Sequence, residues 1–503
     1  MTPLEIGRGP ETDPVQRLCQ RLAGHRLIIA SNRGPVSYCL GADGSLRMER
    51  GSGGIVTALT AASRLVPVTW VASAMTAGDR QAAGPSRRLQ VPLNEHEILL
   101  HFVVPPEDQY HRFYNVISNP LLWFLQHYMW DSPHSPNITR SIYDAWEKGY
   151  VPVNEAFAET VAREVGDDAS AYIMLHDYHL YLAPGMIRRM LPTAIVQHFT
   201  HIPWPSPRYW YLLPPSMRQA IIESLCAADI VGLQTRRDVR NFLNCCEDFL
   251  PGAEVDYDAA TVGYEGREVK VTHYPIAIDA EGLAAFAKGP QVQAYEEELR
   301  QYLGEKTIVR VDRLEPSKNL VRGYRAYDIL LRRRPDLAGR VTFLSFLVPS
   351  RTNLSLYQRY RDEVFEIINT INEDYGNAQW QPIRVFYEEN YAQAVAAMRL
   401  YDVLLVNPLI DGMNLVAKEG PLVNRRDGVL ILSETAGAYE QLGEHALAVA
   451  PADVEGTARA LEAALAMAGE ERRRRAATLR QVVQAEDIVQ WLEHQLQDLA
   501  FLR

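Results

Sequence analysis

The feature that most constrains the fold of this chain is a regular alternation of short apolar runs with longer helix-forming segments. In the first half, the predicted strands are residues 26–31, 70–74, 100–104, 171–175, 194–199, 229–233 and 269–274. In the second half, they are residues 307–311, 341–347, 383–387, 403–406, 429–432 and 446–449. Parallel strands need crossover connections of about a dozen residues or more, which are usually helical. The alternation therefore predicts an α/β chain with doubly wound parallel sheets, covered by helices on both faces.

The length of the chain, 503 residues, predicts two such units, because a single hydrophobic core stops growing at roughly 250 to 300 residues. A polar, helix-prone segment at residues 280–304 separates the two alternations. We therefore expect one Rossmann-like domain over residues 1–279 and a second over residues 280–480, facing each other across a cleft. The last helix, within residues 481–503, is expected to pack back on the N-terminal domain.

Net charge and cysteine usage exclude several classes of function. The formal net charge of −11 argues against a general affinity for nucleic acid. The five cysteines include no CxxC pair and fit neither a disulfide framework nor a zinc site, which favours a reducing, cytoplasmic location. No apolar run approaches the ~18 residues of a membrane-spanning helix. We expect small-molecule substrates and no nucleic-acid or membrane partner, and the sequence leaves open whether the protein forms a homo-oligomer.

The segment DGMNLVAKEG, which begins at Asp411, follows the apolar run 403–406 and predicts an anion site. Strand, tight turn and a helix starting near Asn414 would leave unpaired amides at the helix N-terminus, where a phosphate binds. Those amides belong to Gly412, Met413, Asn414 and Leu415. Glu419 lies about one turn further, where a carboxylate can bind the hydroxyls of a ribose, and Asp411 can do the same for a sugar. The alternative is an ordinary capped helix with an exposed Glu419.

Three cationic side chains follow the other predicted strands of the second half. Arg313 and Lys318 come after residues 307–311, and Arg351 comes after residues 341–347. An arginine fork and a lysine point charge at one strand end can converge on a diphosphate. Each residue alone is also a common surface residue, but their shared position at strand ends predicts a nucleoside diphosphate and a second anion.

In the first half, polar and glycine-rich loops follow the strands. Asn32-Arg33-Gly34-Pro35 ends the first strand, and Gly51-Ser52-Gly53-Gly54 opens a helical segment. Such loops allow close approach of the backbone to phosphate, although plain turns fit the glycine content equally well. His176-Asp177-Tyr178-His179 and His201-Ile202-Pro203 follow two further strands, at the edge where open sheets bind ligands. No GxGxxG dinucleotide fingerprint is present.

A helix rich in aromatic residues is predicted over about residues 110–130. Aromatic side chains at helical spacing usually belong to the core. Tyr114 and Trp123 carry polar tips as well, so they can also line a sugar pocket, and the spacing alone favours the core.

Seven short segments of the chain occur in a particular order. They are SNRGPV at Arg33, GSGGIVTAL at Gly54, HDYHL at His176, HIPWP at His201, VDRLEPSK at Arg313, PSR at Arg351 and DGMNLVAKE at Asp411. In this order they resemble glycosyltransferase family 20, the retaining trehalose-6-phosphate synthases, which have the GT-B fold. The resemblance runs from about Leu27 to about Leu499.

The resemblance implies a role for each matching residue. The donor nucleotide sugar would be bound by Gly54, Arg313, Lys318, Asp411, Gly412, Met413, Asn414, Leu415 and Glu419. The acceptor sugar phosphate would be bound by Arg33, Trp70, Tyr114, Trp123, Asp177 and Arg351. The residues implied in catalysis are Asp177, His201, Arg313 and Lys318. Tyr114 and Trp123 are thereby expected in the site instead of the core.

The resemblance also implies the reaction, in which glucose passes from a nucleoside diphosphate glucose to glucose 6-phosphate to give trehalose 6-phosphate. In retaining enzymes of this fold, the leaving diphosphate takes the proton of the acceptor hydroxyl on one face of the donor. The protein then holds both substrates and stabilises the charge on the diphosphate. We expect no cofactor and no metal, because Arg313, Lys318 and a helix N-terminus can supply the positive charge.

Some residues depart from the family pattern. Where common synthases read RLDYSKG, this chain has Arg313-Leu314-Glu315-Pro316-Ser317-Lys318-Asn319, and Gly34 replaces a bulkier residue. The end of this segment, Pro316-Ser317-Lys318-Asn319, and the segment Pro421-Leu422-Val423-Asn424 resemble the pseudo-glycosyltransferase that makes validoxylamine phosphate. The donor of that enzyme carries an unsaturated cyclitol. Glucosylglycerol-phosphate synthases also belong to the family. The alternatives are therefore another acceptor, a cyclitol donor, or a catalytically silent regulatory homologue, and the donor base (UDP, GDP or ADP) stays open.

Overall fold

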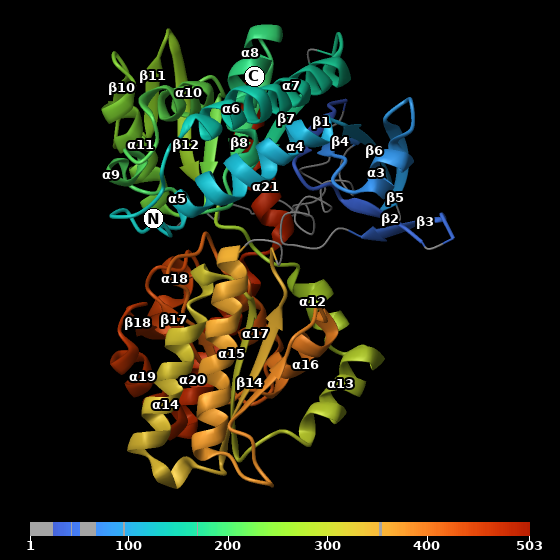
Figure 1. Cartoon of the computed structure of the whole chain (residues 1–503). Coiled ribbons are helices and arrows are strands. Elements are labelled where there is room, and N and C mark those ends of the chain that lie inside the picture. The colour runs from blue at the N-terminus through green and yellow to red at the C-terminus, as the bar shows by residue number, and fades with distance from the viewer. Residues whose placement is uncertain are drawn as a thin grey trace, which may run out of the picture.

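The computed structural model describes residues 24–41, 43–50, 67–93, 96–168, 170–351 and 355–502. These residues form two lobes, each built around its own β-sheet (Figure 1). The N-terminal half of the chain forms the upper lobe and the C-terminal half the lower lobe, so the two predicted alternations correspond to two separate sheets.

Within the described residues, the upper lobe contains a ten-stranded sheet in the order β10-β11-β12-β9-β8-β7-β1-β4-β6-β5. Its parallel strands are β1 (Leu27–Ser31), β4 (Val68–Ser73), β6 (His96–Val103), β7 (Tyr172–His176), β8 (Ile195–Phe199), β9 (Ile230–Leu233) and β12 (Arg267–His273). Each lies within a few residues of a predicted strand. Every residue of β1, β4, β7, β8 and β9 is buried, which explains their continuous apolar runs.

The edges of the upper sheet are antiparallel, which the sequence analysis did not predict. The edge strands are β5 (Arg88–Leu93), β10 (Glu254–Asp256) and β11 (Thr261–Tyr264), and a separate hairpin pairs β2 (Val36–Leu40) with β3 (Leu46–Arg50). These strands are exposed on one face, so polar residues interrupt the apolar runs that revealed the buried strands.

The sheet of the lower lobe is parallel throughout its described strands. Its order is β15-β14-β13-β16-β17-β18. The strands are β13 (Lys306–Arg313), β14 (Val341–Val348), β15 (Ile383–Phe386), β16 (Val403–Val406), β17 (Val429–Ser433) and β18 (Leu447–Val449). All six predicted strands of the second half are present, which confirms a second Rossmann-like unit.

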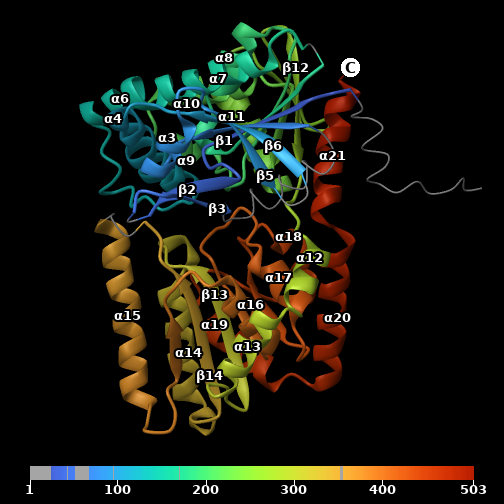
Figure 2. The ribbon, with the colours of Figure 1, turned by 90° about the vertical axis from the view of Figure 1, so that its right-hand side faces the viewer.

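Helices cover both faces of both sheets (Figures 1 and 2). Those of the upper lobe are α3 (Ala77–Ala83), α4 (Glu107–His111), the π-helix η2 (Arg112–Trp123), α5 (Phe124–Gln126), α6 (Arg140–Ala145), the π-helix η3 (Trp146–Tyr150), α7 (Val151–Val165), the 3₁₀ turn η4 (Tyr178–Leu180), α8 (Ala183–Met190), α9 (Pro207–Trp210), α10 (Pro215–Leu225) and α11 (Arg236–Phe249). The helical segments that follow are α12 (Ala280–Phe286), α13 (Pro290–Arg300), the 3₁₀ turn η5 (Pro316–Lys318), α14 (Leu320–Arg333), the 3₁₀ turn η6 (Pro335–Leu337), α15 (Ser355–Tyr375), α16 (Tyr391–Leu400), α17 (Val416–Val423), α18 (Tyr439–Leu442), the 3₁₀ turn η7 (Gly443–His445), α19 (Val454–Ala466), α20 (Gly469–Ala485) and α21 (Ile488–Phe501).

The C-terminal segment forms two helices where the sequence predicted one. Helix α20 runs along the lower lobe and α21 along the upper lobe (Figure 2). Asp487 separates them, and its side chain caps α21 by accepting hydrogen bonds from the amides of Val489 and Gln490. Gln495 of α21 then bonds Gln197 in the upper sheet at 2.7 Å. The C-terminal helix therefore returns to the N-terminal sheet.

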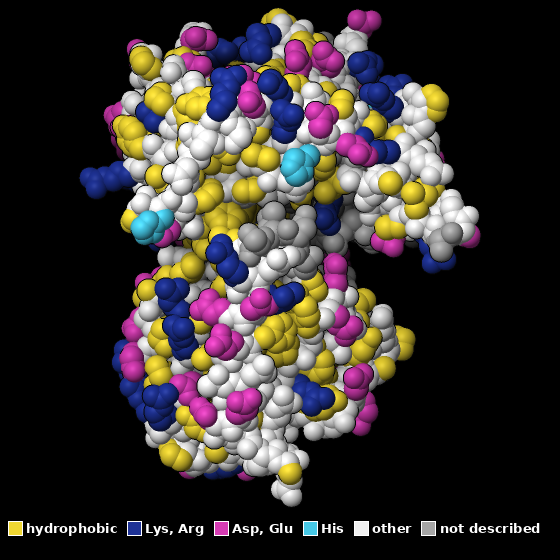
Figure 3. Space-filling view, viewed as in Figure 1, with side chains coloured by type: hydrophobic (Ala, Val, Ile, Leu, Met, Phe, Trp, Pro, Cys, Tyr) yellow, Lys and Arg dark blue, Asp and Glu magenta, His cyan; other side chains and the backbone are white. Residues whose placement is uncertain are grey.

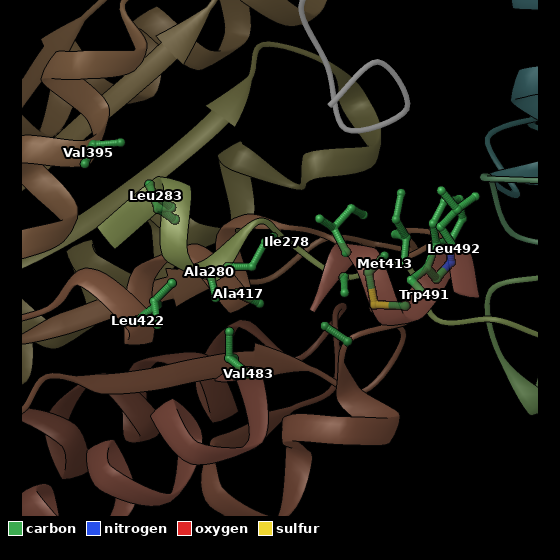
Figure 4. Packing of buried hydrophobic residues seen from close by; sticks show 14 of the residues in the cluster. Ile278, Ala280, Leu283, Val395, Met413, Ala417, Leu422, Val483, Trp491 and Leu492 are labelled. Atoms are coloured by element: carbon green, nitrogen blue, oxygen red, sulfur yellow. The ribbon is translucent and has the colours of Figure 1, made fainter. Parts of the chain in front are cut away.

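The chain crosses between the lobes twice, at neighbouring places. Ile278 and Asp487 form a parallel β-bridge, and the amide of Ile488 donates to the carbonyl of Ile278 at 3.2 Å. Buried apolar side chains, among them Met413 and Trp491, surround this crossing and continue from one lobe to the other (Figure 4). If one lobe moves relative to the other, the backbone must therefore bend at these two connecting segments.

On the face in Figure 3, side chains of both charges occur over both lobes. Four consecutive arginines, residues 472–475, would suit a solvated helix face, but the first of them, Arg472, is buried and pairs with Asp402 at 3.1 Å. Among the described helices, none is long and apolar enough to cross a membrane.

Candidate active site

The two lobes meet around a cavity of about 720 Å³. Residues that follow the carboxyl ends of β1, β7 and β8 form one side of it, and residues that follow β13, β14 and β16 form the other. Open parallel sheets bind ligands at these ends. Twelve predicted site residues line the cavity: Arg33, Tyr114, Trp123, Asp177, His201, Arg313, Lys318, Arg351, Asp411, Met413, Asn414 and Leu415.

The segment after β16 forms a tight turn that faces the cavity. Asn414 has a φ of 73°, and α17 begins two residues later, at Val416, close to the predicted start near Asn414. Within the described part of the chain, the amides of Met413, Asn414 and Leu415 donate to no other residue, although all three line the cavity. Unpaired amides that precede a helix form a binding place for a phosphate.

Gly412 lies beneath this turn and does not line the cavity. A Cβ at this position would lie 2.0 Å from the carbonyl oxygen of His201, in the other lobe. Such an approach is shorter than any van der Waals contact, so a side chain here would push the turn away from the upper lobe. Glycine therefore brings the Asp411 turn against the His201 loop.

Lys318 stands opposite the same turn and pairs with the carboxylate of Asp411. Although burial opposes its charge, Asp411 raises the pKa of Lys318 above its ordinary value. The loop that carries it is held from behind by Arg310, whose guanidinium is buried and donates to the Lys318 carbonyl at 3.1 Å. Asn319, with a φ of 58°, donates to the carbonyl of Asn407 at 3.0 Å. The ammonium group is thereby fixed at the wall of the cavity.

Glu315 connects two cavity arginines. Its carboxylate is buried and lies 2.9 Å from both Arg313 Nη2 and Arg351 Nη1. Burial alone would raise the pKa of Glu315, but the two arginines and Lys318 outweigh it and lower the pKa to about 2. Glu315 is therefore an anion at neutral pH that holds both guanidinium groups.

Arg351 reaches across the gap between the lobes. Its Nη2 donates to Asn119 Oδ1 at 3.0 Å, and its guanidinium carbon lies 4.6 Å from the centre of the Trp123 ring. Tyr357, on its own lobe, accepts a hydrogen bond of 2.6 Å from Nη1. The planar, charged group thus combines hydrogen bonds with a cation–π contact on the other lobe.

The upper wall at this place is the π-helix η2, which contains Pro120 and ends at Trp123. The Tyr114 ring stacks on Tyr110 and on His179, with ring centres 5.6 and 5.9 Å apart. The wider turn of a π-helix alters which side chains share a face, and such turns are frequent at functional sites. Tyr114 and Trp123 therefore line the cavity, although Trp123 is only 2% exposed.

Asp177 and His201 lie side by side at the ends of β7 and β8. Asp177 has a φ of 74°, and its Oδ1 accepts a hydrogen bond of 3.2 Å from the His201 amide. Burial raises the pKa of Asp177 to about 7 and lowers that of His201 to about 3. A neutral imidazole beside a partly protonated carboxyl can hold sugar hydroxyls, whereas the positive charge of the site comes from Arg313, Lys318 and Arg351.

Besides Gly412, two predicted ligand residues that the structure describes are not on this cavity wall. Trp70 is fully buried in β4, and its Nε1 donates to Ser31 Oγ at 2.8 Å, so it can support Ser31 but offers no surface to a ligand. Glu419 lies one turn into α17, where burial raises its pKa to about 7 and Tyr391 donates to it at 3.4 Å. Gly54 lies outside the described residues.

The sequence analysis assigned no individual site role to several residues that the structure brings to the site. Asn119, His127 and His176 line the cavity, and Glu315 lies behind its arginines. His176 Nδ1 lies 3.2 Å from His201 Nε2. The one sequence signal for His127 is its position four residues after Trp123, because residues four apart on a helix lie on the same face.

The sequence also matches a known family. The family model "Glycosyltransferase family 20" matches residues 25–501. The chain belongs to this family. It is therefore a glycosyltransferase, and its two Rossmann-like domains form the GT-B fold that the resemblance implied.

Relatives within family 20 differ in their reported activities. The chain is 34% identical to a bifunctional trehalose-6-phosphate synthase/phosphatase of Thermoproteus tenax, across 93% of this chain and 62% of that relative, which is thus considerably longer. It is 29% identical to a validamine 7-phosphate valienyltransferase of Streptomyces hygroscopicus, across 95% of both chains. The structure of a UDP-forming α,α-trehalose-phosphate synthase from Burkholderia xenovorans in complex with glucose 6-phosphate superposes with a TM-score of 0.80, at 27% identity, and the match covers 94% of this chain and 99% of that one.

Proposed function

We propose that this family 20 enzyme transfers glucose from a nucleoside diphosphate glucose, with UDP-glucose as the first candidate, to glucose 6-phosphate. The products are trehalose 6-phosphate and the nucleoside diphosphate, and the anomeric configuration of the glucose is retained. The observation that carries the proposal is a single cavity with two cationic places: Arg313 and Lys318 beside the Asp411 turn, and Arg351 against Trp123 of the other lobe. Two such places suit a substrate pair with a diphosphate and a phosphate.

On the donor side, the diphosphate lies against Arg313, Lys318 and the unpaired amides of the Asp411 turn. Asp411 binds the transferred glucose, and Glu419 binds the ribose from the next turn of α17. The negative charge on the diphosphate grows as the bond to the sugar breaks. Fixed positive groups at that place stabilise this charge without having to reorganise, which lowers the barrier.

On the acceptor side, the phosphate of glucose 6-phosphate lies against Arg351 and Arg33, near Tyr114. The C1–O bond of the donor to the diphosphate breaks, and a new bond forms from C1 to the anomeric oxygen of the acceptor. The proton of that acceptor hydroxyl passes to the departing phosphate oxygen on the same face. Asp177 and His201 orient the sugar rings, so that the protein contributes position and charge.

The proposal includes catalysis without a metal. Arg313, Lys318 and the amides after Met413 supply positive charge where many other transferases use a divalent cation. We expect full activity after dialysis against EDTA, with no increase on addition of Mg²⁺ or Mn²⁺. Loss of activity that either cation restores would refute this part alone.

The experiment that tests the proposal measures release of nucleoside diphosphate from UDP-, GDP- and ADP-glucose, each with glucose, glucose 6-phosphate or glycerol 3-phosphate. We expect glucose 6-phosphate to be used far better than glucose with at least one donor. Equal kcat/KM for glucose and glucose 6-phosphate would refute the acceptor assignment. Activity with glycerol 3-phosphate alone would favour a glucosylglycerol-phosphate synthase, and inactivity with every pair would favour a cyclitol-phosphate transferase or a catalytically silent homologue.

A second candidate, transfer from or to a cyclitol, is supported by the valienyltransferase relative, which matches over 95% of both chains. The ending Pro316-Ser317-Lys318-Asn319 and the segment Pro421-Leu422-Val423-Asn424 are the features that resemble that branch. Under this candidate, glucose donors would be poor and a nucleotide-linked unsaturated cyclitol would be transferred to an amino-cyclitol phosphate. Turnover of that pair above the glucose pair would replace the first proposal.

A further inference from the structure

His127 is a cavity residue that the reaction described above does not use. It follows α5 directly, its side chain is 4% exposed, and it lies on the wall of the cavity. Its ring stacks on Trp123, with ring centres 4.0 Å apart and an angle of 25° between the planes. The Trp123 ring also makes a cation–π contact with the guanidinium of Arg351. His127 thus belongs to the aromatic group beside the predicted acceptor phosphate.

The hydrogen bond of His127 determines which of its two nitrogens carries the proton. Nδ1 lies 2.8 Å from the carbonyl oxygen of Trp123. A carbonyl oxygen only accepts, so Nδ1 must carry the hydrogen and donate it. In a neutral imidazole the other nitrogen, Nε2, then has a lone pair and no hydrogen. Burial lowers the pKa of His127 to about 4, so the ring is neutral at physiological pH.

Nε2 of His127 has no hydrogen-bond partner among the described residues. Its charged surroundings are Asp411, Glu315 and Lys318, which act on the ring from the lower lobe. The cationic side chains of the cavity can only donate hydrogen bonds, and Asn119 Oδ1 is already occupied by Tyr178 and Arg351. The arginine and lysine side chains of the cavity can donate hydrogen bonds to the oxygen of a sugar hydroxyl placed here. His127 Nε2 can accept the hydrogen of that hydroxyl.

We propose that His127 Nε2 accepts a hydrogen bond from a ring hydroxyl of the acceptor sugar and selects acceptors that carry this hydroxyl. The inference rests on the proposed function, because it takes Arg351 and Trp123 as the acceptor side of the cavity. His127 holds the acceptor ring through its hydroxyl while Arg351 holds the phosphate. The proton stays on the sugar hydroxyl, so His127 is a specificity residue and not a base.

Three substitutions separate this role from mere support of Trp123. His127→Phe keeps a ring that stacks on Trp123 but removes both nitrogens. His127→Asn places an amide where Nδ1 was and can keep the bond to the Trp123 carbonyl, but it does not reach the position of Nε2. His127→Gln reaches that position with an oxygen that can accept. If the lone pair matters, Gln restores acceptor use and Asn does not.

The test combines these variants with 2-, 3- and 4-deoxyglucose 6-phosphate as acceptors, and with UDP-glucose as the donor. For the parent, we expect one deoxy acceptor to lower kcat/KM roughly ten- to hundredfold, the effect of a lost hydrogen bond that leaves a buried group unpaired. His127→Phe and His127→Asn should lower kcat/KM for glucose 6-phosphate by a similar factor and should show no further loss with that one deoxy acceptor. His127→Gln should stay within about threefold to fivefold of the parent.

Two results would overturn the inference. One is that His127→Phe and His127→Asn keep parental kcat/KM. The other is that their losses multiply with the losses of all three deoxy acceptors, which would mean that His127 contacts none of these hydroxyls. The melting temperature and the nucleotide affinity of each variant show whether it is folded. A parent inactive with glucose 6-phosphate would instead refute the proposed function, so the two failures are distinguishable.

Discussion

The donor and acceptor sides of the cavity are built in different ways. The donor side is made of the turns after β13 and β16, two neighbouring strands of one sheet, and its ion pair joins Lys318 to Asp411 within one lobe. The acceptor side is assembled across the gap, where Arg351 of the lower lobe packs on Trp123 and bonds Asn119 of the upper lobe. The described part of the donor side thus lies within one domain, whereas the acceptor side depends on how the two domains meet.

This difference predicts which step each side controls. Groups fixed within one lobe can stabilise the leaving diphosphate without moving, so their loss should act mainly on kcat. Groups that span the gap bind the acceptor only when the lobes are together, so their loss should act mainly on the acceptor KM.

The largest effect is expected for Lys318→Ala. Removal of this fixed charge should lower kcat about 100-fold or more, as for other single electrostatic contacts to a leaving group. Lys318→Arg should not restore it, because the larger planar group does not fit the place of the ammonium beside Asp411. Steady-state kinetics with saturating substrates measure this, and the exposed Lys288→Ala serves as the control. A kcat within threefold of the parent would remove Lys318 from the mechanism.

A smaller, one-sided effect is expected for Arg351→Ala. The acceptor KM should rise roughly ten- to hundredfold, because charge-assisted bonds to the phosphate are lost, and the donor KM should change much less. Arg361→Ala, which removes an arginine of α15 whose side chain is 42% exposed and pairs with Asp362, is the matched control. An equal rise of both KM values would contradict the separation into two sides.

Gly412→Ala tests the contact that joins the two sides. The new Cβ would lie 2.0 Å from the His201 carbonyl, so the Asp411 turn or the His201 loop must shift. We expect kcat/KM to fall about tenfold and the melting temperature to fall by a few degrees, as overpacking costs ~1 to 3 kcal/mol. Gly469→Ala, whose nearest neighbour would be 3.6 Å away, should change neither. Parental activity of Gly412→Ala would show that the turn does not need this contact.

The smallest effect on turnover is expected for Glu315→Gln, which removes the anion shared by Arg313 and Arg351. Because the folded pKa of about 2 lies below the unfolded value of about 4.3, the carboxylate stabilises the fold above about pH 5, and this contribution is lost as the pH falls toward 2. The variant should therefore be less stable than the parent at pH 7, by on the order of 3 kcal/mol, and the difference should shrink at pH 3. Urea denaturation at both pH values measures it, with the exposed Glu305→Gln as the control. A difference that stays constant between the two pH values would contradict the ion-pair assignment.

The donor side could be predicted from the sequence because each of its two segments directly follows an apolar strand. Buried parallel strands read as continuous apolar runs, and the polar residues after Val406 and Arg313 necessarily lie at one edge of the sheet. The start of α17 lies within two residues of the predicted one, but the positive φ of Asn414 is a backbone property that the residue pattern does not reveal.

The acceptor side was harder to predict for physical reasons. Tyr114 and Trp123 sit on a π-helix, whose wider turns break the 3.6-residue spacing on which the core prediction was based. Trp70 lies in a strand that is buried on both faces, so no alternation indicates which way its side chain points. His127 and Asn119 acquire their roles only through contacts with distant residues, whereas the position of Arg351 after a predicted strand already placed it at the ligand-binding edge of the sheet.

The most direct test of the central claim is a proton NMR spectrum of the product formed from UDP-glucose and glucose 6-phosphate. The account predicts a non-reducing disaccharide phosphate in which both anomeric protons show the small coupling of α-linkages, formed in equal amount with UDP. A β-linked product, or release of UDP together with free glucose and no disaccharide, would contradict it.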